Sequence, residues 1–394
     1  MFDINEEIEG LFGQIVAWRR DFHRYPELGY QEKRTAEIVA EHLKSLGLEV
    51  VKCIGKTGVV GLLRGGQPGR TLAMRADMDA LPITETTGFE FSSENNGVMH
   101  ACGHDGHMAM LLGTATILAK HRNQIKGTIK FIFQPAEEGG NGAAAMIADG
   151  VLENPKPDAL IASHLMFQEA GTITIRKGYA FLASDTFHIR VNGQGGHGCK
   201  PHESTDTLLA ACKMVMDIQM IVSRKVSPQD VATITVGTIH SGTRENIIPG
   251  LAEFSGTVRT LRPGVRQIII NGLHQICQGV CEAIGTTYEM QYQKGCDPVY
   301  NDPELMNIIE GAIKKVLGEE KVFEADLCRP GSEDFSAYLQ TGIPGGYIWV
   351  GGAYPGEEIP SRNHQSAYNW DENAMKAGTA AQVSAALEFL DSWG

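Results

Sequence analysis

Three histidines, a cysteine and an aspartate fall within eight residues, in the segment His100-Ala-Cys102-Gly-His104-Asp105-Gly-His107. A second segment, residues 130–138, reads as an apolar strand that ends in the adjacent carboxylates Glu137 and Glu138. Two isolated histidines, His164 and His364, follow further along the chain. Thiolate, imidazole and carboxylate groups together can hold two divalent cations, and a two-metal centre can activate water for hydrolysis. These residues therefore predict a hydrolytic metal centre.

The elements that must position these side chains are short apolar strands. Asp77 and Asp79 follow a strand expected at 71–76, the paired glutamates follow one at 128–133, and His164 follows one at 159–163. His364 comes after a strand at 346–351 and a Gly/Pro-rich loop, and Cys102 and His104 precede a helix expected at 108–121. Open α/β sheets bind their ligands at the carboxyl ends of their strands. The candidate ligands are therefore expected to meet at one edge of one sheet.

The remaining pattern alternates strands with helices. Further strands are expected at 49–53 and 58–64, and helices at 4–23, 31–46, 142–149, 303–317, 332–339 and 371–393. This alternation favours an α/β fold with helices on both faces of the sheet.

The pattern changes in the middle of the chain. Strands are expected at 185–192, 231–241, 251–261 and 286–293, with helices at 204–224 and 265–285. The order βαββαβ is that of a ferredoxin-like domain. We therefore predict a discontinuous catalytic domain, residues 1–183 and 294–394, with an inserted domain, residues 184–293, which we call the lid.

Composition narrows the class of protein. The 394 residues are 42% hydrophobic and 21% charged, which is typical of globular proteins. The net charge of −13 argues against nucleic acid or an anionic membrane as a partner. The eight cysteines have no C-x-x-C spacing and predict reduced thiols, and the acidic start of the chain lacks the features of a signal peptide. A cytoplasmic protein is expected.

Simpler interpretations exist for each motif. Cys102, His104 and His107 could form a structural zinc knuckle, although a compact fourth ligand is missing. Cys102 and His104 could act as a thiol–imidazole pair, although a spacing of two residues gives poor geometry for proton transfer. His164 or His364, each taken alone, could be a hydrogen-bonded structural histidine.

Six motifs occur in an order that is familiar. They are residues 74–82 (MRADMDALP), 99–107 (MHACGHDGH), 133–139 (FQPAEEG), 195–198 (GGHG), 246–249 (NIIP) and 332–335 (SEDF). With them the whole chain resembles the amidohydrolase branch of the dinuclear-metal aminoacylase and carboxypeptidase superfamily. This branch includes hippurate hydrolases, N-acetyl-amino-acid deacetylases and indole-acetyl-amino-acid hydrolases. The resemblance implies a zinc-exopeptidase-like catalytic domain, with a central mixed sheet flanked by helices, and a ferredoxin-like lid.

The resemblance also implies roles for particular residues. Two divalent ions per subunit (zinc, manganese, cobalt or nickel) would share Cys102 as a bridging ligand. Glu138 and His364 would complete the site of one metal, and His104 and His164 that of the other. Glu137 would be the general base. From the lid, His197 would donate a hydrogen bond to the oxyanion after domain closure, in its own active site or in that of the partner subunit. Asn246 would lie near the substrate.

The predicted reaction is hydrolysis of an N-acyl or N-aroyl amino acid to a carboxylate and a free amino acid. Asn246, Arg244 and Arg259 are candidates to bind the substrate carboxylate, and Asp79 and Asp77 to orient the ligand imidazoles. Cleavage of peptides, as a dipeptidase or carboxypeptidase, is the close alternative, and a non-catalytic metal-binding protein a more distant one. The segments Gly198-Cys-Lys200 and Leu165-Met-Phe167 depart from the usual pattern and put specificity in doubt. The resemblance implies a homodimer or homotetramer formed through the lid.

Overall fold

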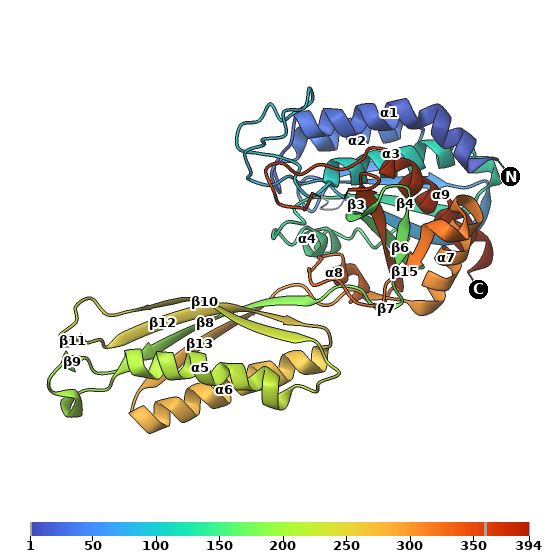
Figure 1. The fold of residues 1–394 in the computed structure, drawn as a ribbon. Coiled ribbons are helices and arrows are strands. Elements are labelled where there is room, and N and C mark those ends of the chain that lie inside the picture. Colours follow the sequence, from blue (N-terminus) through green and yellow to red (C-terminus); the bar gives the residue numbers. More distant parts are fainter. Residues whose placement is uncertain (1, 358–360, 394) are drawn as a thin grey trace. The chain divides into compact units, whose positions relative to one another are not determined.

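The computed structural model describes residues 2–357 and 361–393 and divides into two compact units (Figure 1). Unit 1 is formed by residues up to 180, 300–328 and from 334 onward, and unit 2 by residues 181–299 and 329–333. The segment 184–293 lies within unit 2. Its action as a lid stays a prediction.

A mixed eight-stranded sheet organises unit 1, as predicted for an α/β fold. The strand order is β1-β2-β4-β3-β5-β16-β6-β15, and the neighbours β4, β3, β5 and β16 run parallel. The strands are β1 (Glu49–Ile54), β2 (Gly58–Arg64), β3 (Gln67–Asp77), β4 (Lys126–Gln134), β5 (Ala159–Glu169), β6 (Ile173–Ile175), β15 (Val322–Glu324) and β16 (Gly345–Ala353). A small ribbon pairs β7 (Gly178–Tyr179) with β14 (Tyr300–Asn301).

Helices of two kinds pack around this sheet. The inner ones, α3 and α9, are buried almost all round, because Met, Leu, Ile and Ala occupy every face of α3. The outer α1 is amphipathic and packs on α3. The helices of this unit are α1 (Ile4–Arg24), α2 (Lys33–Ser45), α3 (His104–Lys120), α4 (Gly142–Ala148), α7 (Pro303–Leu317), α8 (Ser336–Leu339) and α9 (Ala374–Ser392).

Several boundaries differ from the sequence expectations. Helix α3 begins at His104 and not at Met108, so the imidazole of His104 belongs to its first turn. Strand β5 continues to Glu169, so His164 lies within the strand and not after it. The helix expected at 332–339 is the short α8, and only from Ser336 onward. Apolar periodicity does not mark the first turn of α3, because polar ligand-type residues occupy it.

Unit 2 has the predicted βαββαβ order. Its four-stranded antiparallel sheet is ordered β10-β12-β8-β13, with β10 at one edge. The strands are β8 (Ala183–Asn192), β10 (Ala232–Ser241), β12 (Leu251–Thr260) and β13 (Thr287–Lys294), and the helices are α5 (Thr207–Lys225) and α6 (Pro263–Ile284). Both helices bury their apolar faces in the core of this unit (Figure 1). A separate ribbon joins β9 (Gly196–His197) to β11 (Ile247–Ile248).

No helix among the described residues is both long and apolar enough to cross a membrane.

Candidate metal centre

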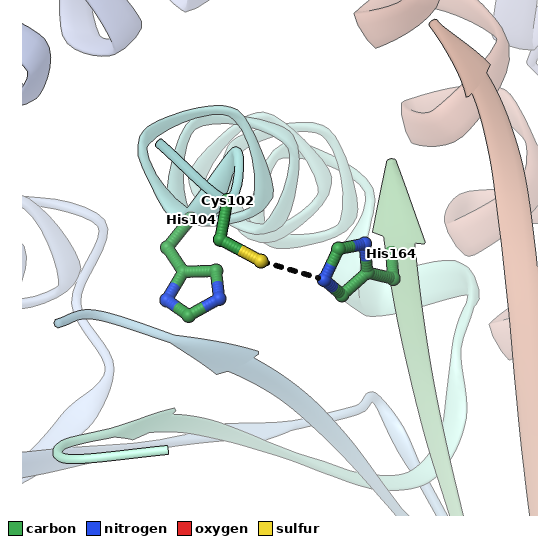
Figure 2. A group of neighbouring side chains, drawn as sticks. All are labelled: Cys102, His104 and His164. Atoms are coloured by element: carbon green, nitrogen blue, oxygen red, sulfur yellow. Dashed lines mark hydrogen bonds between the residues drawn. The ribbon is translucent and has the colours of Figure 1, made fainter. Parts of the chain in front are cut away.

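Cys102 and His104 lie at the N-terminus of α3. Gly103, between them, adopts a φ of 91°, a region that favours glycine, and a Cβ there would lie 3.1 Å from Leu165 Cδ1. This turn directs the sulfur of Cys102 toward His164 on β5 (Figure 2), and the ring centroids of His104 and His164 lie 6.0 Å apart. Cys102 Sγ lies 3.4 Å from His164 Nε2. Residues 62 positions apart in the chain thus form one buried cluster.

The two histidines of this cluster are oriented alike. His104 Nδ1 donates to the carbonyl of Asp79 at 2.8 Å, and His164 Nδ1 donates to the carbonyl of Leu165 at 2.6 Å. Nδ1 therefore carries a proton in each ring, and Nε2 is the nitrogen that faces the cluster. The Nε2 of His104 is buried and has no hydrogen-bond partner among the described residues. An unpartnered buried polar atom is costly, and a bound cation would satisfy it.

Glu137 and Glu138 follow β4 in a turn held by two buried carboxylates. Asp79 accepts from the backbone amides of Glu137 at 3.0 Å and Glu138 at 2.9 Å. Glu32, from the start of α2, accepts from the amide of Ala136 at 2.9 Å. Ala136 has a φ of 52°, which is uncommon for a residue with a side chain. The fold therefore maintains a strained turn at this point, and the turn presents both glutamates.

His364 completes the arrangement from a loop after β16. Its backbone amide donates to the carbonyl of Ala101 at 2.7 Å, and its Nε2 lies 3.1 Å from Glu138 Oε1. His364 also has a positive φ, of 64°. Strained non-glycine residues cluster at functional sites in proteins, and here two of them, Ala136 and His364, adjoin or belong to the candidate ligands.

Two groups of ligand-type atoms share Cys102. One consists of Cys102, His104 and His164, and the other of Cys102, Glu138 and His364; within each, the ligand atoms lie within 4.8 Å of one another. The structure therefore brings together all five side chains predicted to hold metal, in the two predicted sets. Glu137 lies in a further group with His104 and Glu138. Soft sulfur, imidazole nitrogen and carboxylate oxygen suit divalent transition metals, so the residues present fit a pair of such cations.

Charge in the cluster also favours cations. Burial opposes ionisation of Cys102, but the charges of His164 and His104 hold the pKa of the thiol well below its usual value. The Cys102 sulfur and the Glu138 carboxylate raise the pKa of His364 to about 10. A thiolate is the form of cysteine that binds metal. A cation would take the place of the proton that these two anions hold on His364.

Asp77, the last residue of β3, orients a histidine outside the five. His107 Nδ1 donates to Asp77 Oδ1 at 2.6 Å, and His107 Nε2 accepts from the amide of Leu165 at 2.9 Å. His107 is thus a neutral connection between β3 and β5, and burial lowers its pKa to about 4. Asp77 Oδ2 accepts from Arg75 at 2.7 Å and lies 3.7 Å from His104 Nε2.

Asp105 and His100 belong to the same motif as the candidate ligands Cys102 and His104. Asp105 Oδ2 accepts from His23 Nδ1 at 2.8 Å and lies 3.0 Å from Arg19 Nε, so it joins α3 to α1. His100 is fully buried, and burial lowers its pKa to about 3. Asp105 thus supports the first turn of α3, to which it belongs, by joining it to α1.

The predicted residues of the lid lie in unit 2. The exposed His197 and Asn246 are neighbours, since His197 pairs with Ile247 and the amide of Gly198 donates to the carbonyl of Asn246 at 2.9 Å. Arg244 is exposed near them, and its carbonyl accepts from the amide of Ile247 at 3.2 Å. Arg259 lies near the other end of β12, opposite Ser184 of β8. The structure therefore groups His197, Asn246 and Arg244, and places Arg259 apart from them.

Two neighbours of the centre escaped the sequence analysis. Glu32 is completely buried and supports the glutamate turn from 104 residues away. Asn363 Nδ2 donates to Cys102 Sγ at 3.3 Å. A glutamate at the start of a predicted helix, and an amide next to a candidate ligand, were the available signals. Neither is specific without the fold.

Comparison with known proteins agrees with this geometry. Residues 73–388 match the model of peptidase family M20/M25/M40. The chain is 40% identical to thermostable carboxypeptidase 1 of Saccharolobus solfataricus over 98% of this chain and 99% of that protein. It is 44% identical to an N-acyl-L-amino acid amidohydrolase of Geobacillus stearothermophilus over 76% of this chain and 82% of that protein.

A solved structure extends the comparison. A Bacillus subtilis protein, described as a dinuclear metal binding peptidase of this family, superposes with a TM-score of 0.84 at 31% identity. The match covers 97% of this chain and 99% of that one.

Proposed function

The chain belongs to peptidase family M20/M25/M40, and from this we propose that it is a metal-dependent amidohydrolase. Its substrates are N-acyl or N-aroyl amino acids, and its products a carboxylate and a free amino acid. The observation that carries the proposal is the pair of ligand groups that share Cys102.

Five side chains would hold two divalent cations. Cys102 would belong to both sites, His104 and His164 would complete one, and Glu138 and His364 would complete the other. When bound, the pair supplies Lewis acidity, which lowers the pKa of water and polarises the scissile carbonyl. The ligand set suits zinc, manganese, cobalt or nickel.

Glu137 is the proposed general base. Its carboxylate lies close to the ligand atoms of His104 and Glu138, and Asp79 fixes its backbone. We assign it the proton of the attacking water, which it then delivers to the departing amine. The ionised carboxylate can take the proton, and the carboxylic acid that it becomes can release that proton to the amine.

His197 is the proposed oxyanion donor. Its Nδ1 accepts from the amide of Cys199 at 3.2 Å, so the neutral ring carries its proton on Nε2. An exposed Nε2–H can donate to the oxygen that becomes negative during attack. Asn246, beside it, and Arg244 and Arg259 are the proposed partners of the substrate carboxylate, with Asn246 the best placed of the three relative to His197.

Unit 2 is the proposed site of self-association into a homodimer or homotetramer. Strand β10 presents the edge of its sheet, and edge strands can pair with another chain. On α5, Leu209, Met216 and Met220 lie on one helical face and are 58%, 71% and 50% exposed. This combination favours a second copy of the chain as the partner.

A reducing, cytoplasmic location is also proposed. All eight cysteines are free thiols, and three of them, Cys53, Cys199 and Cys212, are exposed.

Peptide cleavage is the second candidate, favoured by the likeness to a carboxypeptidase. The test compares release of free amino acid from hippurate and N-acetyl amino acids with release from dipeptides, using protein stripped of metal and then reconstituted with Mn²⁺ or Zn²⁺. Metal-dependent release from the acyl panel supports the amidohydrolase. Release from dipeptides alone would replace it with the peptidase.

A further inference from the structure

The sulfur proposed to bridge the two cations has a contact outside the ligand set. Asn363 Nδ2 lies 3.3 Å from Cys102 Sγ, and the Oδ1 of the same amide is buried with no hydrogen-bond partner in the described part of the chain. A thiolate only accepts, so the amide must present its NH₂ group to the sulfur. We infer that Asn363 is a positioning residue. It donates an N–H···S hydrogen bond to the Cys102 thiolate and so limits how strongly the sulfur donates to the cations. This inference rests on the proposed metal centre.

A bridging thiolate has a particular need for such a donor. A carboxylate can bridge two cations through separate oxygens, whereas a thiolate must offer both of them the same atom. Cys102 is only 7% exposed, so water has little access to the remaining lone pair. Buried acceptors are normally paired. Hydrogen bonds to a metal-bound sulfur also withdraw electron density from it and so tune the metal.

The backbone allows two consecutive side chains to reach the same sulfur. In extended chain, neighbouring side chains point to opposite sides. At His364 the positive φ of 64° breaks that alternation, so that Asn363 contacts Cys102 while the His364 ring joins the ligand group of Cys102 and Glu138. A residue with a side chain adopts this φ only when its surroundings enforce it.

The loop does not need Asn363 as an anchor. The amide of His364 already donates to the carbonyl of Ala101 at 2.7 Å, and Ser361 Oγ accepts from the amide of Asn369 at 3.0 Å. The hydrogen bond of the Asn363 side chain goes to the sulfur. Its expected effect is therefore electronic, on the thiolate, and not on the stability of the loop.

The test uses cobalt, whose bond to a thiolate gives a charge-transfer band in the near ultraviolet. The full chain is stripped, loaded with Co²⁺ and compared with Asn363→Leu, which keeps the size of the side chain but removes the donor. Gln365→Leu makes the same amide-to-alkyl change at an exposed position of the same loop. Asn363→Leu should shift the band to longer wavelength, because the sulfur electrons are less stabilised, and reduce turnover about 10–100-fold. Gln365→Leu should leave the band in place.

An unchanged band in Asn363→Leu at full cobalt occupancy would overturn the inference, whatever the activity. If that variant fails to bind Co²⁺, Asn363→Ala is measured against the same criterion. A wild-type protein that binds cobalt without a sulfur band would instead contradict the metal centre, and this inference with it.

Discussion

At the scale of single residues, the centre is built by hydrogen bonds that leave ligand atoms free. The Nδ1 atoms of His104 and His164 are occupied by backbone carbonyls, so each ring presents Nε2. Asp79 contributes both its carboxylate and its backbone carbonyl to the centre. It accepts from the amides of Glu137 and Glu138 while its carbonyl accepts from His104. One aspartate thus couples the proposed base to ligands on two elements.

Glu137→Gln tests the separation of base from ligand. The amide cannot take a proton, so turnover should fall by about 100–10,000-fold. Both metals should stay bound, since the five ligands are intact. Metal analysis and amino acid release on the same sample check this. Glu138→Gln is the control, and it should lose metal. A Glu137→Gln protein that loses its metal, or that keeps its turnover, contradicts the assignment.

Asp79→Asn tests the coupling. An amide at this position cannot accept from both backbone N–H groups, so the glutamate turn should loosen and activity or metal affinity fall about 10–100-fold. Asp158→Asn is a matched control. Asp158 accepts from the amide of Thr71 at 2.7 Å, and Thr71 lies in β3, the strand that precedes Asp79. Equal losses in the two variants would mean a general effect on the stability of β3.

At the scale of elements, the function depends on where strands and helices end. The order of apolar and polar runs was sufficient to predict β3, β4 and the acidic residues at or after their ends, which are Asp77, Asp79, Glu137 and Glu138. It could not show that β5 continues past His164 or that α3 begins at His104, because ligand residues interrupt the apolar periodicity there. Contacts such as Glu32 with Ala136, and Asn363 with Cys102, span 104 and 261 residues. A local pattern cannot report them, and neither Glu32 nor Asn363 belongs to the motifs that carried the resemblance.

Glu85, which His23 of α1 contacts, should make the stability of the fold depend on pH. Burial opposes ionisation of Glu85, but hydrogen bonds from His23 and the amide of Ser93 hold its pKa at about 2, below the ordinary 4.5. A lowered carboxyl pKa stabilises the fold fully above pH 4.5, and this contribution is lost as the pH falls toward 2. In urea unfolding, Glu85→Gln should therefore have a lower free energy of unfolding than wild type at pH 7. The difference between the two free energies should narrow below pH 4.5.

Glu94→Gln is the control for this effect. Glu94 lies in the same segment and its side chain is 57% exposed, so this variant should unfold like wild type at every pH. A gap between wild type and Glu85→Gln that is constant from pH 7 down to pH 3 would show that the Glu85 carboxylate contributes no linkage.

At the scale of the whole molecule, unit 2 carries the proposed contact between copies. Substituting both Met216 and Met220 with Glu places two charges on the exposed face of α5, and burying them in an interface is unfavourable. The variant should sediment as a monomer at concentrations where wild type is a dimer or tetramer. Ile268→Glu, on an exposed apolar position of the neighbouring α6, should keep the wild-type assembly. A double variant that still associates would place the interface elsewhere.

The central claim is that Cys102 and four residues around it hold two cations, and that the resulting centre hydrolyses an N-acyl amino acid. Its most direct test is to titrate the stripped chain with Mn²⁺ or Zn²⁺ and to measure bound metal and amino acid release at each addition. We predict two equivalents per chain, with full release only when the second is bound. Full release from the stripped protein, or saturation of activity at a single equivalent, would contradict the two-metal account.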